Sequence, residues 1–527
     1  HVSMVAGRGP CVKAHGGRKP KSSPDPHIAE ISGGPDTLAG VKITRGARAE
    51  GRHTGLILAL VGAAQFMVVL DISIVNVALP SIRNDLGFSI GGLQWVVNAY
   101  TITFGGLLLL GGRASDLLGR RRMFIAGILL FALASFAGAI APNATLLVVA
   151  RAAQGVGGAI VAPSTLAVLM TTFREGPERQ RALGVWGTMT AAGGSAGAIL
   201  GGVLTDVLDW RWIFLVNVPV GAAIAWEARR SLAPDPQRPA AEKGRNFDVL
   251  GALTVTTGLV VAVFAIVRTT TEGWASLQTI GALAFAVLLL GTFVVIESRI
   301  ATRPLVPLRI FQSRLLTGAN VLVLLMSAGM FAMWYFVSLY LQQVLGYSPI
   351  KAGLAFLPMT LTIAVGSMRA AAIVRRLGIR TTLLTGFVCS AAGLLLFSRI
   401  HAGGDYLSDV LAPSVLCSAG MGLCMVPLTT TAVAGVAHAE AGLASGLLNV
   451  SRLFGGALGL ALLVAIADSD RSSLLAQHHS VAAATSAGFG RAFLVASIFA
   501  LAGALLVLPL VRHVRPIEPE LAVDLSG

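Results

Sequence analysis

Long apolar segments recur along this chain and limit its fold more than any other feature. A helix that crosses a lipid bilayer needs about 20 mostly apolar residues, and fourteen segments of roughly this length can be read from the sequence. They cover residues 54–79, 91–111, 123–141, 144–170, 183–205, 213–228, 247–267, 276–296, 315–341, 349–374, 381–398, 408–432, 441–467 and 487–511. So many long segments, with Gly and Pro inside them, exclude a porin-like barrel. The sequence therefore predicts an all-α membrane protein with 14 transmembrane helices.

Positive charges are unevenly distributed among the loops between these segments. Only 12% of the residues are charged, too few to cover the surface of a soluble fold, and 40 Lys and Arg stand against 25 Asp and Glu. With a cytoplasmic N-terminus, the inner loops and tails hold 25 Lys and Arg residues and the outer loops hold seven. This follows the positive-inside rule and predicts that both termini are cytoplasmic. The net charge of +15 then needs no nucleic-acid partner, because the positive residues set orientation and meet anionic lipid headgroups.

Three glycine patterns recur in the two halves of the chain at offsets of 259 to 265 residues. For example, Leu118-Gly119-Arg120-Arg121 is similar to Leu377-Gly378-Ile379-Arg380. Such duplication is typical of alternating-access transporters, whose two halves face each other across a central site. The first six segments then pair with the last six, and the seventh and eighth are an insertion. The predicted parts are a basic, disordered tail (1–53), a first six-helix bundle (54–232), a linker with two inserted helices (233–314), a second bundle (315–512) and a short tail (513–527).

Asp71 lies inside the first apolar segment. A carboxylate within the hydrocarbon region is costly, so it must face a cavity, find a partner or bind a proton. A proton-coupling site needs a carboxyl group of this kind. The alternative is a hydrogen-bonded, inert Asp near the outer interface.

Two further motifs contain charged residues that could serve a transport cycle. Asp116, Arg120 and Arg121 lie with spaced glycines in the loop after the second segment, and an ion pair made there in one conformation only would latch a gate. Positive-inside loops also contain arginines, but that reading leaves the glycines and Asp116 unexplained. Arg151 opens a glycine-rich stretch of the fourth segment. It either tunes the protonation of a buried carboxylate or extends to the cytoplasmic surface.

Other polar and aromatic residues inside the segments could line a cavity for an amphiphilic ligand. The candidates for substrate binding are Trp95, Asn98, Tyr100, Trp334, Tyr340, Gln343 and Asn449. Trp and Tyr are also common at membrane interfaces, so these residues equally suit an interface belt. Arg369 and Arg452 lie within later segments, and each either lines a polar cavity, pairs with a carbonyl or extends to the membrane surface. Gly193, Gly197 and Gly201 form a GxxxGxxxG face that either packs a helix closely or seals the two halves.

The sequence gives no support to an enzyme. It contains no Walker A motif and no HExxH motif, and its two GxSxG matches, residues 87–91 and 193–197, do not follow a strand pattern, so neither ATP-driven pumping nor hydrolysis is indicated. The four cysteines are scattered, and Cys417 and Cys424 have no nearby His or further Cys, so no metal site is predicted.

Together these elements resemble the major facilitator superfamily, and within it the fourteen-helix family of drug:proton antiporters, over residues 54–512. Asp71 to Pro80 is similar to the first-helix motif, with Ser73 where threonine is usual, and Gly112 to Arg122 resembles the loop between helices two and three, with Leu117 replacing a basic residue. Arg151 to Ala159 is similar to the fourth-helix motif, and Trp210 to Pro219 resembles the stretch entering the sixth helix. The fifth-helix antiporter motif reads Gly197-Ala198-Ile199-Leu200-Gly201-Gly202, with Ala198 where proline is expected.

The resemblance implies two six-helix bundles plus two inserted helices. It also implies that Asp71 carries the proton, that Arg151 tunes it, and that Asp116 with Arg120 and Arg121 latches the cytoplasmic gate. The predicted function is proton-coupled efflux of lipophilic or cationic drugs or antibiotics from a bacterial cell by a monomer in the plasma membrane, driven by the proton gradient without a cofactor. Two alternatives stay open: a narrow exporter of one metabolite or self-made antibiotic, and a transporter-like sensor that moves nothing.

Overall fold

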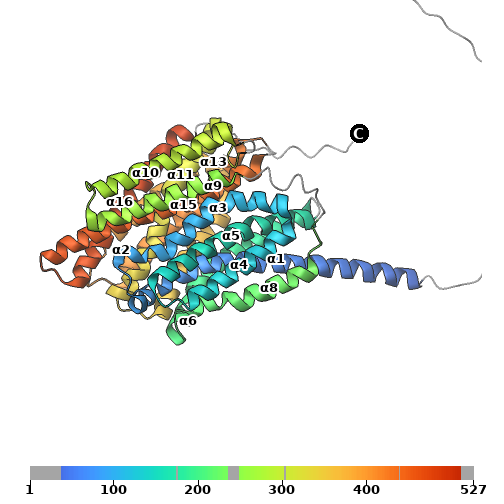
Figure 1. Ribbon diagram of the computed structural model, residues 1–527, viewed down its shortest axis with the longest axis horizontal. Helices are drawn as coiled ribbons and strands as arrows, with labels where there is room; N and C mark the ends of the chain where they lie inside the picture. The colour runs from blue at the N-terminus through green and yellow to red at the C-terminus, as the bar shows by residue number, and fades with distance from the viewer. Residues whose placement is uncertain (1–36, 174–175, 236–247, 302–303, 438–439, 512–527) are drawn as a thin grey trace, which may run out of the picture. The chain divides into compact units, whose positions relative to one another are not determined.

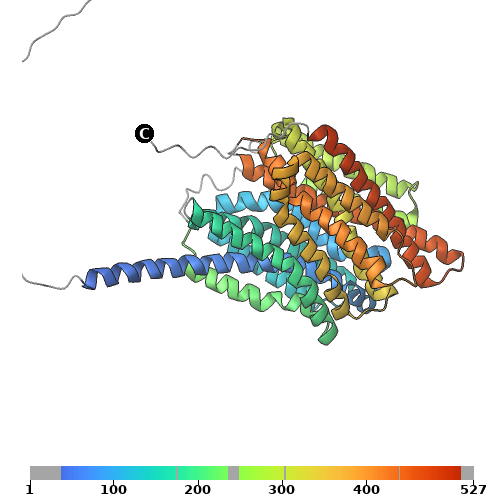
Figure 2. The ribbon, with the colours of Figure 1, turned by 180° about the vertical axis from the view of Figure 1, so that it is seen from behind.

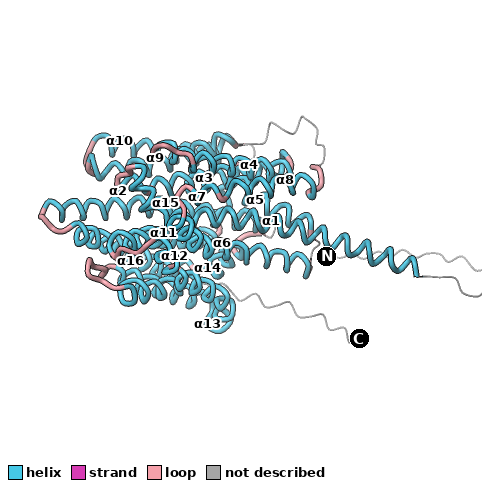
Figure 3. The backbone as a smooth tube through the Cα atoms, turned by 90° about the horizontal axis from the view of Figure 1, so that it is seen from below, coloured by secondary structure: helices cyan, strands magenta, loops and turns pink. Residues whose placement is uncertain are grey.

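The computed structural model describes residues 37–173, 176–235, 248–301, 304–437 and 440–511. Within these ranges the regular elements are helices, with no β-strand (Figure 3). The chain forms two compact units, His1–Gly51 and Arg52–Gly527, and the packing described below is that of the second unit. The expected all-α architecture is confirmed.

The first half contains the helices of the first six apolar segments (Figure 1). Their bounds are α1 Thr37–Leu86, α2 Ile90–Leu93, α3 Trp95–Leu118, α4 Arg120–Ala139, α5 Ala144–Thr172, α6 Pro177–Val207, α7 Trp212–Leu215 and α8 Asn217–Ser231. α1 begins at Thr37, inside the tail predicted to be disordered, because Ala, Arg and Lys in residues 37–53 favour extension of an existing helix. The rest of that tail (1–36) and the second tail (513–527) lie outside the described residues.

The inserted helices and the second half follow. Their bounds are α9 Val249–Glu272, α10 Leu277–Val295, η2 Ile296–Ile300, η3 Leu308–Gln312, α11 Arg314–Leu339, η4 Tyr340–Val344, α12 Pro349–Ala355, α13 Leu357–Phe397, η5 Tyr406–Leu411, α14 Ala412–Ala434, α15 Ala441–Ala476 and α16 Val481–Leu510. Figure 2 shows the helices of the second half, coloured gold to red, packed against one another.

All fourteen predicted segments fall on helices, but their number as membrane spans stays a prediction. Among the described residues, eleven helical stretches are long and apolar enough to cross a membrane. One of them, Pro349–Phe397, contains two predicted segments, which meet at Gly378, where φ is +80° and the backbone is not helical. α6 and α8 correspond to the fifth and sixth segments and are not among the eleven.

The repeated Leu-Gly-x-Arg pattern has a structural counterpart. Gly119, between α3 and α4, has a φ of +106°, and Gly378 has a φ of +80°. Side chains rarely adopt such left-handed conformations, so each glycine permits a sharp change of direction between two apolar segments. The two halves therefore use the same device at equivalent places, as expected of a duplicated chain.

The two halves contact each other where α1 and α11 end. The Ser338 hydroxyl donates a hydrogen bond to the carbonyl oxygen of Asn76 at 2.6 Å, and Gln342 Nε2 donates to the carbonyl of Val77 at 2.8 Å. α6 also packs closely against α12 of the other half. A Cβ placed on Gly202 of α6 would lie 2.6 Å from the carbonyl oxygen of Pro349. These contacts hold the halves together at this end of the bundle.

The GxxxGxxxG face of α6 packs within the first half rather than between the halves. A Cβ on Gly197 would lie 2.7 Å from Cβ of Ser73 on α1, and one on Gly201 would lie 2.6 Å from the Ile74 carbonyl oxygen. The neighbouring face of α6 reaches the other half through Gly202 and Ala198. The carbonyl of Ala198 lies 2.4 Å from where Gly353 of α12 would carry a Cβ. The residue that replaces the expected proline thus lies at the junction of the halves.

Candidate functional site

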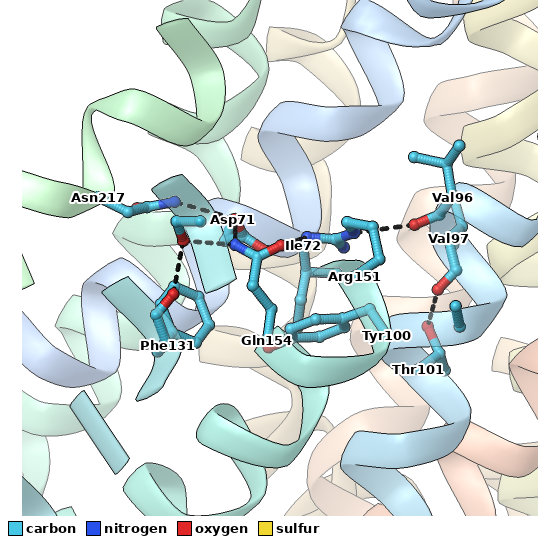
Figure 4. Close-up of polar contacts among 12 residues, drawn as sticks. Asp71, Ile72, Val96, Val97, Tyr100, Thr101, Phe131, Arg151, Gln154 and Asn217 are labelled. Atoms are coloured by element: carbon cyan, nitrogen blue, oxygen red, sulfur yellow. Dashed lines mark hydrogen bonds and ion pairs between the residues drawn. The ribbon is translucent and has the colours of Figure 1, made fainter. Parts of the chain in front are cut away.

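The carboxyl group of Asp71 is fully buried inside the first half, about midway along the membrane-spanning part of α1. Its two oxygens accept three hydrogen bonds, which Figure 4 shows together. Oδ2 accepts from Arg151 Nη1 at 2.5 Å, and Oδ1 accepts from Gln154 Nε2 and Asn217 Nδ2, each at 3.0 Å. The alternative of an interfacial Asp does not fit this complete burial.

Arg151 is held in place by groups on three other helices as well as by its own. It is 1% exposed, so it does not extend to the cytoplasmic surface. Its Nε donates to the carbonyl of Val96 at 2.9 Å, and its guanidinium lies 4.5 Å from the ring centroid of Tyr100 and 5.7 Å from that of Phe214. A guanidinium between aromatic faces is stabilised by cation–π attraction. The guanidinium that pairs with Asp71 is therefore contacted by side chains or backbone of α1, α3, α5 and α7.

Gln154 and Asn217 complete the site, and sequence reasoning did not single them out. Gln154 accepts from Arg151 Nη1 at 2.9 Å while its Nε2 also donates to the Ser135 hydroxyl at 2.6 Å. Asn217 opens α8 and is 1% exposed. Both residues lie inside stretches that carried the family resemblance. A buried amide one turn from a buried Arg, as in Gln154, is the signal that could have identified them.

The chemistry of this cluster follows from its burial. A buried ion pair that loses one partner leaves an uncompensated charge, which costs several kcal/mol. Asp71 can take a proton only if Arg151 finds other acceptors, and the Gln154 and Val96 oxygens are already in place. The arrangement can thus exchange a proton at Asp71 for a rearrangement of Arg151.

The loop residues predicted as a latch separate into two groups. Arg120 Nη2 lies 3.8 Å from Asp116 Oδ1, with both side chains about half exposed. Arg121 instead belongs to a second contact: Asp235 accepts from the backbone N–H of Arg121 and of Arg122, each at 3.0 Å. Asp235 therefore caps the N-terminus of α4, where a negative charge is favourable. Sequence reasoning missed this residue, and the latch stays a prediction.

Three predicted substrate-binding residues carry buried polar atoms that have no hydrogen-bond partner in the described part of the chain. These atoms are Asn98 Oδ1, the Tyr100 hydroxyl and Trp334 Nε1. The Trp334 ring stacks on Phe356 with 5.0 Å between centroids. Buried polar groups normally have partners, so these atoms are available to a polar group of a ligand. Tyr100 also joins this set to the Asp71 cluster.

The other predicted site residues lie elsewhere. Trp95 packs in an apolar cluster with residues of α9 and α15, and the Tyr340 hydroxyl donates to the carbonyl of His401 at 2.8 Å. Gln343, Asn449 and Arg369 are exposed, and Arg452 is half-buried. The structure therefore does not gather all the predicted substrate residues into one group, and their roles stay predictions.

Comparison with known proteins gives consistent results. Residues 61–460 match the sequence profile of the Major Facilitator Superfamily. A cephamycin export protein of Amycolatopsis lactamdurans is 40% identical, covering 88% of this chain and 94% of its own. A puromycin resistance protein of Streptomyces alboniger is 40% identical over 90% of this chain and 93% of its own length. Among solved structures, an inward-facing bacterial homologue of the human lysosomal transporter Spinster has a TM-score of 0.65 at 12% identity. The match covers 87% of this chain and 97% of the other, and it supports the fold.

Proposed function

The chain belongs to the major facilitator superfamily, and we propose that it is a proton-coupled efflux transporter that exports lipophilic or cationic antibiotics by alternating access. The observation that supports this most strongly is the buried Asp71–Arg151 ion pair with its two amide partners. A charged pair at this depth is costly and typically marks an ion or substrate pathway. The related export and resistance proteins point to antibiotics as the cargo.

The proposed cycle starts with a proton that reaches Asp71 from outside. Neutral Asp71 no longer attracts the guanidinium, and Arg151 is then held by the Gln154 and Val96 oxygens, to which it already donates. α1 carries both Asp71 and the carbonyls bonded to Ser338 and Gln342 of the other half. A shift of α1 on protonation therefore acts directly on the contact between the halves. Substrate release to the outside and proton release to the cytoplasm complete the exchange.

Further elements of the proposal rest on the sequence. The protein is placed in the bacterial plasma membrane with both termini cytoplasmic, in accordance with the excess of positive residues in the inner loops. It acts as a monomer, its partners are small amphiphilic molecules, protons and the bilayer, and the proton gradient supplies the energy without a cofactor.

Dye export tests this proposal. We expect inside-out vesicles that contain the protein to transport ethidium under a pH gradient, and a protonophore to abolish that transport. Transport that continues at the same rate after the gradient collapses would overturn the proton coupling.

A narrow exporter is the second candidate. It is favoured by the names of the two relatives, each of which refers to a single antibiotic. Competition separates the candidates: structurally unrelated compounds inhibit export through a broad pocket, whereas only close analogues inhibit export through a narrow one.

A further inference from the structure

Two acidic side chains are buried where the inserted helices begin and end, before α9 and after α10. Asp248 is the N-cap of α9, and Glu297 lies in η2, directly after α10. Asp248 is 8% exposed and Glu297 is 4% exposed. Both residues adjoin the two linkers predicted to be cytoplasmic. The duplication of the six-helix bundles does not explain this pair, because it belongs to the insertion.

Each carboxyl group has one bonded oxygen and one without a partner. Asp248 Oδ1 accepts from the backbone N–H of Gly251 at 2.7 Å, and Glu297 Oε2 accepts from the N–H of Val306 at 3.1 Å. Asp248 Oδ2 and Glu297 Oε1 are buried and have no donor among the described residues. The two carboxyl groups lie within hydrogen-bonding reach of each other. Ionised carboxylates only accept hydrogen bonds, so two of them cannot satisfy one another.

Within the described part of the chain, no positive side chain pairs with either of these two buried carboxyl groups. No ion pair there includes Asp248 or Glu297: Arg299 of η2 is exposed, and Arg309 of η3 pairs with Glu440 at 2.8 Å. The other charged residues on the described elements that pack against α9, α10 and η2 are Arg113 and Asp116 of α3 and Arg452, Asp468, Asp470 and Arg471 of α15. α9 itself carries Arg268 and Glu272 at its far end. Among the charged groups, Asp248 is the one that acts on Glu297.

A metal ion fits the site poorly. Calcium and magnesium take about six or more oxygen ligands, most of them from carboxylates, carbonyls and water. The described residues contain no group of three or more His, Cys, Asp or Glu side chains that could hold a metal ion. A proton needs only the two oxygens that are present. It also removes one of two like charges that would otherwise be buried together.

We propose that Asp248 and Glu297 form a proton-binding site, separate from Asp71, in which one proton is shared between Asp248 Oδ2 and Glu297 Oε1. The bound proton joins the start of α9 to the end of α10. Through the N–H of Val306 it also fixes the linker that leads into α11. The site is a property of the insertion and does not depend on the proposed export function.

The site makes stability depend on pH in a defined direction. The folded protein holds the shared proton, whereas in the unfolded chain both carboxyl groups ionise at their ordinary acidic pH. The folded state therefore binds more protons, and stability falls as the pH rises. The titration belongs to the pair rather than to either residue.

The test uses the full chain in lipid nanodiscs and compares wild type with Asp248→Asn and Glu297→Gln. Either amide supplies a permanent N–H donor in place of the shared proton. We expect wild type to lose a protonated-carboxyl infrared band and thermal stability as the pH is raised from neutral to alkaline. Both variants lack that band and keep their stability over the same range. Glu272→Gln, at the exposed far end of α9, serves as the control and behaves as wild type does.

Two results would overturn the proposal. A wild-type stability that does not change with pH, together with loss of stability in Glu297→Gln at every pH, would show an ionised Glu297 held by a positive partner. Stability that depends on added calcium or sodium in wild type but not in Glu297→Gln would show a cation site. Glu297→Ala gives a second comparison in case Glu297→Gln does not fold. We expect Glu297→Ala to be less stable than Glu297→Gln at neutral pH, because it loses the hydrogen bond from the N–H of Val306.

Discussion

Asp71 and Arg151 also have neutral hydrogen-bond partners, but each is the other's counter-ion in a buried salt bridge of 2.5 Å. The guanidinium is 1% exposed and the carboxyl group is fully buried, so neither has water as an alternative partner. Breaking a buried pair by removing one member is typically destabilising by about 3–5 kcal/mol, whereas removing both charges costs far less. The pair therefore matters for stability as well as for the proposed proton exchange.

This dependence gives a prediction for Arg151→Ala. We expect the variant to lose about 3–5 kcal/mol of stability, because Asp71 keeps a buried charge without a counter-ion. Adding Asp71→Asn should restore much of the loss. Thermal unfolding in detergent measures both effects, and Arg369→Ala, at an exposed arginine, is the control. An Arg151→Ala variant as stable as wild type would mean that the ion pair is not formed in the folded protein.

At the scale of single elements, α1 contains a proline whose effect reaches the other half. Pro80 has no backbone N–H, so the carbonyl of Asn76, four residues earlier, lacks its helical donor. The Ser338 hydroxyl on α11 donates to that carbonyl at 2.6 Å. Because the donor comes from the opposite half, this hydrogen bond exists only while the halves are in contact at that end.

We therefore expect Ser338→Ala to favour the conformation in which this end is open. A neutral hydrogen bond contributes about 1 kcal/mol, which corresponds to roughly a fivefold change in the ratio of closed to open molecules. Pro80→Ala restores the helical donor and should cancel the effect in the double variant. Spin-label distances between the ends of α1 and α11 measure the populations. An unchanged distance distribution in Ser338→Ala would contradict this role.

The connection between α3 and α4 offers a second test at this scale. Gly119 has a φ of +106°, and an added Cβ would lie 2.4 Å from the Asp235 carboxyl, whereas Gly378 has a similar φ with open space around it. Both Gly→Ala variants store backbone strain of about 1–2 kcal/mol, but only Gly119→Ala also displaces the α4 cap. We expect Gly119→Ala to have the lower melting temperature. Equal losses would mean that Asp235 contributes little.

Across the whole molecule, the features that could be predicted from the sequence are those that a short stretch of residues determines. Apolar length identified the helices, because that signal lies within short stretches, whereas the division into two six-helix bundles from the glycine repeat stays a prediction. The burial of Asp71 was predictable from its position in an apolar segment. Its partner Asn217 and the α4 cap Asp235 were not, because they come from residues more than 100 positions away. The Asp248–Glu297 pair was also missed, because its two residues lie on different elements whose packing the local pattern does not show.

The central claim, that Asp71 couples export to a proton gradient, is tested most directly in reconstituted vesicles with an imposed pH gradient. Wild type and Asp71→Asn are compared for ethidium accumulation against its gradient and for exchange of ethidium without a pH gradient. We expect wild type to perform both and Asp71→Asn to keep the exchange but lose accumulation, because an amide cannot bind and release the proton. Accumulation by Asp71→Asn at the wild-type level would contradict the claim.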